Sequence, residues 1–337
     1  MTGKLKAGRD PFRILALDGG GIRGIFTASF LRTLEDLSHG NVADQFDLIA
    51  GTSTGGIIGL ALACGVPARR ILDLYLEIGP RIFRRPRRLG MLLRPKYDSG
   101  PLARVLKEVF GTRTVNDVRT PVCITSYELT NSYPRIWKDD HAADSLDGGE
   151  TAAWKVALAT SSAPLYFPGA EVAAGDSHVD GGLFANNPTL VGLTEAVHYF
   201  HQPLERIRVL SVGAGERAER IPHERARRMG VWQWKTAIYE HMLIAQARIA
   251  HEIARRLLPA RQYMRINVPL EHPYPFDDYD AAATLVEPGA QAARTHYLEI
   301  RRTFLFAPAR LGRDQKAAVA ATHPRHPSTG IPHRLGI

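Results

Sequence analysis

Apolar runs separated by glycine-rich turns organise the first part of the chain. Residues Phe12–Leu17 form a short apolar run, which predicts a strand, and three glycines follow it. Apolar residues between positions 25 and 37 then recur at close to helical spacing and predict a helix. A second strand is expected over Phe46–Ala50, followed by another turn and a helix that ends near residues 65–67. Two successive strand–turn–helix units predict an α/β fold with a mainly parallel sheet covered by helices.

Later segments add strands and helices of the same kind. Apolar runs predict two further strands, over Val122–Tyr127 and Ile207–Val212, and two helices, over residues 67–83 and Ala152–Thr160. A longer helix is expected over Lys235–Leu258. Its apolar residues lie along one face: Ile238, Met242, Ala245, Ile249, Ile253 and Leu257.

The chain is expected to form one domain followed by a tail. α/β proteins of this length, 337 residues, are often single domains with long loops. The motifs described below fall within residues 12–215, and the part over residues 216–310 is expected to be helical. Beyond that point the chain is polar and rich in proline, glycine and histidine, which predicts a flexible tail over residues 311–337. We therefore expect a single domain over residues 1–310.

Composition narrows the choice of partners and compartment. The 43 lysines and arginines exceed the 34 acids and give a net charge of +9, which favours anionic partners such as phospholipid surfaces or nucleic acid. Cys64 and Cys123 belong to no CxxC motif, so we expect two reduced core thiols. The N-terminus shows no targeting segment, and the longest apolar run, residues 55–66, is about half of a bilayer span. We expect a cytoplasmic protein that makes peripheral contact with the inner membrane face.

The turn after the second strand contains a G-x-S-x-G motif, Gly51-Thr52-Ser53-Thr54-Gly55. A sharp turn that pushes the Ser53 hydroxyl outward brings neighbouring backbone close, so both flanking positions need glycine. Ser53 then stands at a helix N-terminus, whose free N–H groups favour a developing alkoxide. The motif predicts a nucleophilic serine. The alternative, a glycine–serine turn that merely caps the helix, is left open by these five residues alone.

Two other glycine motifs accompany this elbow. The run Asp18–Gly24 exposes consecutive backbone donors, which suits an oxyanion hole. It also satisfies G-x-G-x-x-G, the dinucleotide-binding pattern, with Asp44 near the expected acidic position. However, the dinucleotide pattern needs an acid at the end of a strand, whereas Asp44 precedes the second strand. A nucleotide site also leaves Ser53 unexplained. The third motif, Asp180–Gly182, is a common turn by itself, but Asp180 lies where a strand ends and would supply the base that a serine hydrolase needs.

Taken in order, these three motifs resemble the signatures of the patatin-like phospholipases. Residues 159–164 with Phe167-Pro168, and residues 186–188, support the resemblance, which covers roughly residues 12–215. One departure is Ala214, because the family usually has threonine before the last glycine of the segment 211–215. This difference concerns packing more than chemistry.

The resemblance implies a three-layer α/β/α fold and a catalytic dyad. Ser53 would attack a phospholipid ester to form an acyl-enzyme, with Asp180 as its base and Gly20 and Gly21 as oxyanion donors. Asp180 should be partly desolvated with a raised pKa, since an aspartate of ordinary pKa is a weak base at neutral pH. Arg23 would steady the lipid phosphate, although a surface arginine on the first helical turn explains it too. No metal or organic cofactor is needed.

Two other interpretations remain open. The general α/β-hydrolase triad requires serine, acid and histidine in that order, but no histidine-led oxyanion loop precedes Ser53 and the elbow lies early in the chain. Six histidines follow Asp180 and leave that order satisfiable: His198, His201, His241, His251, His272 and His296. A basic membrane- or nucleic-acid-binding module without catalysis rests on the net charge alone, and the chain has no nucleic-acid or zinc motif, so no nucleic-acid polymer is expected as a partner.

Membrane contact and regulation are the last expectations. Residues 84–96 mix cations with bulky apolar side chains, which suits either an anionic bilayer surface or a solvated loop. The opening Asp18–Thr27 and the helical C-terminal third resemble a bacterial subset of the family, in which a cyclic nucleotide switches on phospholipid hydrolysis in anti-phage defence. This resemblance implies a cyclic oligonucleotide activator, and a homo-oligomer stays open. Candidate stacking and phosphate contacts for the activator are Trp232, Trp234, Tyr239, Arg248, Arg255 and Arg256.

Overall fold

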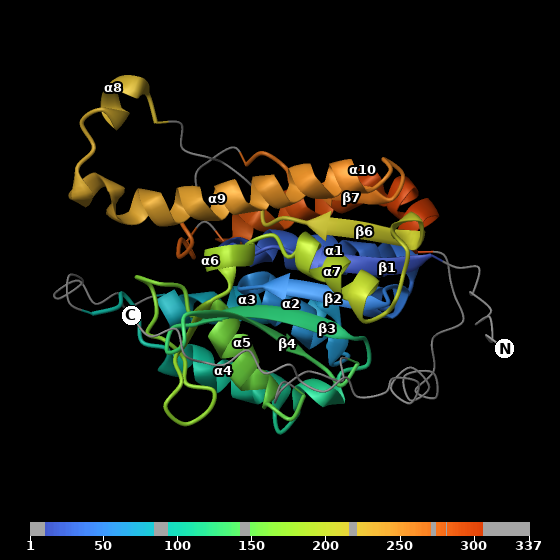
Figure 1. Ribbon diagram of the computed structural model, residues 1–337, viewed down its shortest axis with the longest axis horizontal. Coiled ribbons are helices and arrows are strands. Elements are labelled where there is room, and N and C mark those ends of the chain that lie inside the picture. The colour runs from blue at the N-terminus through green and yellow to red at the C-terminus, as the bar shows by residue number, and fades with distance from the viewer. Residues whose placement is uncertain are drawn as a thin grey trace.

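The described part of the protein is built around a seven-stranded, mainly parallel sheet (Figure 1). The computed structural model describes residues 11–83, 94–141, 149–215, 221–270, 274–280 and 282–305. The strand order is β4-β3-β2-β1-β6-β7, with β5 paired to β3. β1, β2, β3, β6 and β7 run parallel, whereas β4 and β5 are antiparallel to β3. The strands are β1 (Phe12–Leu17), β2 (Leu48–Thr52), β3 (Val122–Glu128), β4 (Tyr133–Lys138), β5 (His178–Asp180), β6 (Ile207–Val212) and β7 (Tyr263–Ile266).

Alternate residues of β1 face two separate cores. Leu15 and Leu17 belong to a large apolar cluster that includes residues of α1 to α5 and α10. Ile14 and Ala16 face a smaller cluster that includes residues of α7 and α9. The sheet therefore lies between two helical layers, which confirms the expected α/β/α architecture. The α-helices are α1 (Gly24–Ser38), α2 (Thr54–Ala63), α3 (Ala68–Phe83), α4 (Gly100–Phe110), α5 (Ala153–Ser161), α6 (Gly182–Ala185), α7 (Thr189–His198), α8 (His223–Ala226), α9 (Val231–Leu257) and α10 (Val286–Phe304). Short 3-10 helices are η1 (Gly21–Arg23), η2 (Val42–Gln45), η3 (Val115–Asp117), η4 (Leu204–Arg206) and η5 (Ala282–Leu285).

Most expected elements are present at nearly the expected positions. The second strand is shifted by two residues, because η2 ends at Gln45 and leaves Phe46 as an extended connecting residue. α4, α7, α10, β4 and β7 are elements that the sequence patterns did not single out. The C-terminal helix packs on the first one: the Tyr297 hydroxyl donates to the Leu37 carbonyl at 2.7 Å, and the Ser29 hydroxyl donates to the Val286 carbonyl at 2.6 Å. The expected tail over residues 311–337 lies outside the described residues.

α9 packs on the sheet through a face other than the one its large apolar residues form. Its buried side chains are mostly small, and Ala254 belongs to the smaller core. The face that the sequence pattern picks out is largely exposed: Ile238 is 58% exposed and Ile249 is 56% exposed. Small side chains let the helix axis approach the sheet closely, so residue size does not identify the buried face. The buried side chains are Tyr239, Leu243, Ala247, Ala250 and Ala254.

Both cysteines are buried and carry free thiols. Cys64 follows α2 in the large core, and Cys123 lies on β3 in the smaller one. Across the described ranges, we find no helix that combines the length and the apolar character needed to cross a bilayer.

Candidate active site

Ser53 occupies a strained turn between β2 and α2. Its backbone has φ 55° and ψ −125°, a conformation that side chains rarely adopt. A Cβ atom on Gly55 would lie 2.3 Å from the Leu17 carbonyl oxygen, so only glycine fits there. The Ser53 N–H donates to the Thr160 hydroxyl at 2.8 Å, which holds the turn against α5. The turn therefore has the tight backbone approach that the motif predicts, and the serine stands at the N-terminus of α2.

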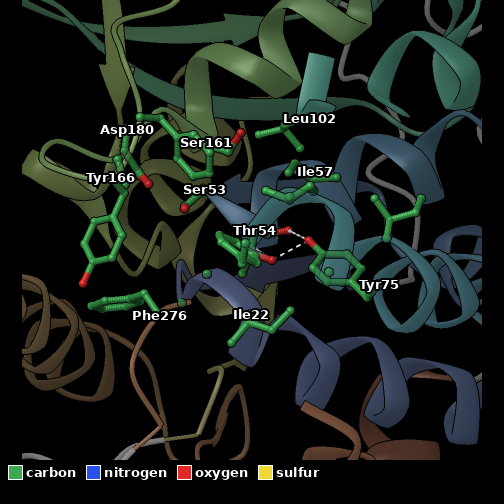
Figure 2. Close-up of a pocket in the computed structure, with 18 of the residues that line it drawn as sticks. Ile22, Ser53, Thr54, Ile57, Tyr75, Leu102, Ser161, Tyr166, Asp180 and Phe276 are labelled. Carbon is green, nitrogen blue, oxygen red and sulfur yellow. Dashed lines mark hydrogen bonds between the residues drawn. The ribbon is translucent and has the colours of Figure 1, made fainter. Parts of the chain in front are cut away.

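Asp180 lies at the end of β5 and is buried beside Ser53. Its N–H donates to the Ser162 carbonyl at 3.0 Å, and its carboxylate accepts the Gly182 N–H at 2.8 Å. Burial raises the pKa of Asp180 to about 7, even though hydrogen bonds from the Ser53 hydroxyl and the Gly182 amide lower it. Figure 2 shows the Ser53 hydroxyl and the Asp180 carboxyl group close together at one pocket. The structure thus brings the two predicted residues together at one pocket.

The glycine loop after β1 lines the same pocket. The Gly19 N–H donates to the Asn186 carbonyl at 3.0 Å, and the Ile22 N–H donates to the Phe276 carbonyl at 2.8 Å. Gly20 and Gly21 lie between these two anchored amides and border the pocket with Ser53. Gly21 has φ 57°, and a Cβ there would lie 2.4 Å from the Phe276 carbonyl oxygen. Both the positive φ and the close Phe276 carbonyl oxygen therefore require glycine at position 21.

A buried ion pair holds the loop from the side of β7. The Arg265 guanidinium makes a two-pronged contact with the Asp18 carboxylate, with one Nη1–Oδ1 distance of 2.7 Å, and also donates to the Ser211 hydroxyl at 2.7 Å. Both charged side chains are nearly buried. Sequence reasoning missed Arg265, because a single arginine in a four-residue strand gives no signal of its distant partner.

Arg23 lies behind the glycine loop. It is 7% exposed, its Nε donates to the Gly20 carbonyl at 3.3 Å, and its guanidinium stacks 4.6 Å from the centre of the Phe276 ring. Arg23 is not among the described residues that line the pocket. In this structure it braces the loop, and its expected contact with a lipid phosphate stays a prediction.

The pocket is apolar over most of its wall. On one side of Ser53, Figure 2 shows Ile57, Leu102 and Tyr75, and on the other side Tyr166 and Phe276. The Tyr75 hydroxyl is hydrogen-bonded to the Thr54 hydroxyl, next to Ser53 in the chain. Such a wall suits a hydrocarbon chain better than a polar substrate. The aliphatic and aromatic residues that α3 and α4 contribute to the lining are Ile71, Leu74, Tyr75, Ile78, Ile82, Phe83, Leu102, Val105, Leu106 and Val109.

None of the described lining residues is a histidine. His251 bonds instead with the Tyr263 hydroxyl at 2.9 Å, and His198 packs its ring against Tyr199. His272 lies outside the described residues. Among the histidines that the structure describes, none is placed as the third member of a triad with Ser53 and Asp180.

The expected regions for a membrane and for an activator are only partly described. Residues 84–93, and with them Arg84, Arg85, Arg87 and Arg88, lie outside the description. Lys96 is ion-paired with Asp277 beside the pocket. The six residues proposed for a nucleotide do not converge: Tyr239 lines the pocket, while Arg255 pairs with Glu252 near the other end of α9. The side chain of Trp232 is not described.

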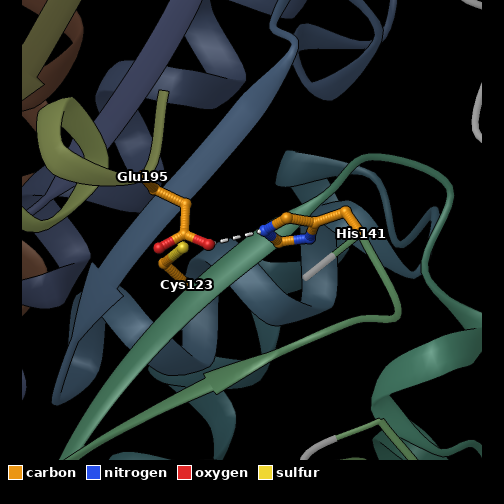
Figure 3. Close-up of side chains that lie close together, drawn as sticks. All are labelled: Cys123, His141 and Glu195. Carbon is orange, nitrogen blue, oxygen red and sulfur yellow. Dashed lines mark hydrogen bonds and ion pairs between the residues drawn. The ribbon is translucent and has the colours of Figure 1, made fainter. Parts of the chain in front are cut away.

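A second cluster joins β3, the segment after β4 and α7 (Figure 3). The two ring nitrogens of His141 lie 2.6 Å from Asp139 and 3.0 Å from Glu195, and Glu195 also pairs with Lys138 at 2.9 Å. Burial lowers the pKa of His141, but hydrogen bonds to Asp139, Cys123 and Glu195 raise it to about 11. In the structure both ring nitrogens of His141 contact carboxylates, and the cluster forms an internal ion network that ties α7 to the sheet.

Comparisons with known proteins agree with this geometry. A family model described as patatin-like phospholipase matches residues 15–193, a segment that contains Ser53 and Asp180. A cGAMP-activated phospholipase of Pseudomonas aeruginosa is 34% identical, over 76% of this chain and 78% of that protein. One from Vibrio cholerae is 36% identical, over 66% and 71%. Patatin-like protein 4 of Arabidopsis thaliana is 36% identical, over 54% and 51%. Tyr239 and Arg265 lie outside the segment that the family model matches.

Proposed function

The chain belongs to the patatin-like phospholipase family and is a lipid ester hydrolase; from that premise we propose that Ser53 and Asp180 form its catalytic dyad. The observation that carries the proposal is that the Ser53 hydroxyl and the buried Asp180 carboxyl group lie close together at one apolar pocket (Figure 2). The absence of a histidine from the described lining supports a dyad over a triad.

The reaction follows from the positions of these groups. The Ser53 Oγ attacks the ester carbonyl carbon while its proton passes to the Asp180 carboxylate. The amides of Gly20 and Gly21 donate to the oxyanion of the tetrahedral intermediate. When this intermediate collapses, the ester C–O bond breaks, the leaving alkoxide takes the proton from Asp180, and the acyl group stays on Ser53. A water molecule then attacks the acyl-enzyme, with Asp180 again as base, and the fatty acid is released.

The electrostatics of Asp180 suit this role. A general base works best when its pKa is close to the working pH, because it is then both ionised and basic enough to take a proton. Burial raises the pKa of Asp180 to about 7, which satisfies both conditions near neutrality. The apolar wall from α3 and α4 would hold the acyl chain, and the +9 charge of the protein favours an anionic membrane surface.

The proposal is tested by hydrolysis of phospholipid vesicles and of a fluorogenic acyl ester. Ser53→Ala and Asp180→Asn should each abolish release of fatty acid. Asp176→Asn is the matched control, since Asp176 lies four residues before Asp180, outside the described pocket lining, and bonds to the amides of Val172 and Ala173. Full activity of Asp180→Asn, or equal loss on replacing any one of the six histidines, would refute the dyad.

A cyclic oligonucleotide is the proposed activator of this hydrolysis, in a defence role against phage. The support is the identity of 34% and 36% to two bacterial phospholipases that are named as cGAMP-activated. The test is calorimetry with a panel of cyclic di- and trinucleotides, together with the rate of vesicle hydrolysis in their presence. If none of these nucleotides binds and none changes the rate, activation is refuted, and the proposal of the dyad is unaffected.

A further inference from the structure

One buried polar group in the pocket has no role in the steps above. Tyr239, on the sheet-facing side of α9, lines the pocket and is 8% exposed. Its hydroxyl has no hydrogen-bond partner within the described residues. Among the buried side-chain polar atoms of this kind, it alone belongs to a described lining residue. An unpaired buried hydroxyl is destabilising, so such a group calls for a partner that binds during function.

The surroundings of Tyr239 place it on the side of Ser53 away from α3 and α4. Its ring packs edge-on against Phe276, with 6.4 Å between the ring centres. Figure 2 shows Phe276 and Tyr166 across Ser53 from Ile57 and Leu102. Tyr239 also interacts electrostatically with the Asp180 carboxylate. If the acyl chain lies on the α3–α4 side of Ser53, the glycerophosphate half of the lipid lies on the Tyr239 side.

We propose that the Tyr239 hydroxyl donates a hydrogen bond to an oxygen of the leaving glycerophosphate half of the substrate. The inference rests on the proposed function, because it assigns the two halves of the lipid to opposite sides of Ser53. No proton moves to or from Tyr239 in this role: the leaving alkoxide still takes its proton from Asp180. The phenol stabilises the departing oxygen and aligns it with the reacting bond.

The electrostatics make Tyr239 a donor and exclude it as a base. Burial raises the pKa of Tyr239, and the neighbouring Asp180 carboxylate raises it further, so the phenol stays protonated throughout the working range of Asp180. An oxygen acceptor would satisfy this hydroxyl, whereas an acyl chain would leave it unpaired.

The decisive experiment compares two substrates with the same acyl chain in wild type and Tyr239→Phe. One is phosphatidylglycerol in mixed vesicles with phosphatidylethanolamine, and the other is a p-nitrophenyl ester, whose leaving group has no glycerophosphate and departs without help. We expect kcat/KM to fall about tenfold on the phospholipid, the effect of one hydrogen bond of about 1.4 kcal/mol. We expect less than a twofold change on the aryl ester.

Thermal unfolding separates this role from a structural one. Tyr239→Phe should keep or raise Tm, because it removes an unpaired buried hydroxyl. Tyr297→Phe, the matched control, removes a hydroxyl bonded to the Leu37 carbonyl and should lower Tm without changing kcat/KM. Equal losses on both substrates, no loss on either, or a lowered Tm in Tyr239→Phe would overturn the inference. If Ser53→Ala remained active, the proposed dyad would fail instead.

Discussion

Asp180→Asn should stabilise the protein at neutral pH while it abolishes hydrolysis. Asparagine has the same shape and keeps an oxygen for the Gly182 amide, which lies 2.8 Å from the carboxylate. It removes the charge that burial makes unfavourable. The pKa of Asp180 is about 7 in the folded protein and about 3.9 in an unfolded chain, a difference of about three. Each pKa unit corresponds to 1.36 kcal/mol, so the buried charge costs about 4 kcal/mol above pH 7.

The sign of this effect fixes its pH dependence. Between about pH 4 and 7 the folded state binds more protons than the unfolded state, because its carboxyl group has the higher pKa. The wild type therefore loses stability as pH rises through this window, and Asp180→Asn does not. The advantage of the variant should be largest at pH 8 and should disappear near pH 4.

The assay is urea unfolding of wild type and variant at pH values from 4 to 8. Asp176→Asn gives a control of opposite sign. Although burial raises the pKa of Asp176, hydrogen bonds from the Ala173 and Val172 amides and from His178 hold it below its ordinary value. That replacement should cost stability at pH 8 and progressively less as pH falls. An advantage of Asp180→Asn that is constant across pH, or a loss at pH 8, would refute the argument from desolvation.

Three further outcomes test the site. The kcat/KM for a p-nitrophenyl ester should rise with pH, reach half its maximum near pH 7 and level off above it, since only the ionised Asp180 takes the proton; a rate independent of pH between 5 and 8 would contradict this. Arg265→Met should lower the free energy of unfolding by about 3–5 kcal/mol because it leaves Asp18 buried and unpaired, and adding Asp18→Asn should restore much of the loss in the same denaturation assay. Ser53→Gly should be inactive but about 1 kcal/mol more stable than Ser53→Ala, since glycine relieves the positive φ; equal unfolding midpoints would show that the turn is unstrained.

The sequence predicted the elements that are defined by local patterns. β1 and β6 begin and end where their apolar runs do, and the elbow needed only the spacing of two glycines around Ser53. Asp180 was identified as a candidate base only because the other two motifs are present in the chain. Its own strand of three residues is too short to give a pattern. For the two strands and the elbow, by contrast, the information lies within a few neighbouring residues.

Features that depend on distant partners escaped prediction. The pairing of Asp18 with Arg265 joins residues 247 positions apart, and the residues around each of them give no sign of the other. The orientation of α9 was hidden for a different reason: alanines at 247, 250 and 254 fit against the sheet, while larger residues such as Ile249 remain exposed. Arg23 faces the Phe276 ring, an arrangement that depends on a segment more than 250 positions later. Charge and apolar periodicity do not encode such long-range packing.

The strand β3 joins the two strands that carry the proposed nucleophile and its proposed base. β2 and β5, which carry these groups, do not pair with each other; each pairs with β3. Thr52 lies opposite Thr125, and Asp180 lies opposite Ser126, the next residue. One peptide unit of β3 therefore separates the two positions in the sheet. Any insertion or slip there would misalign both partners at once, whereas changes on outer strands such as β4 would leave their alignment intact.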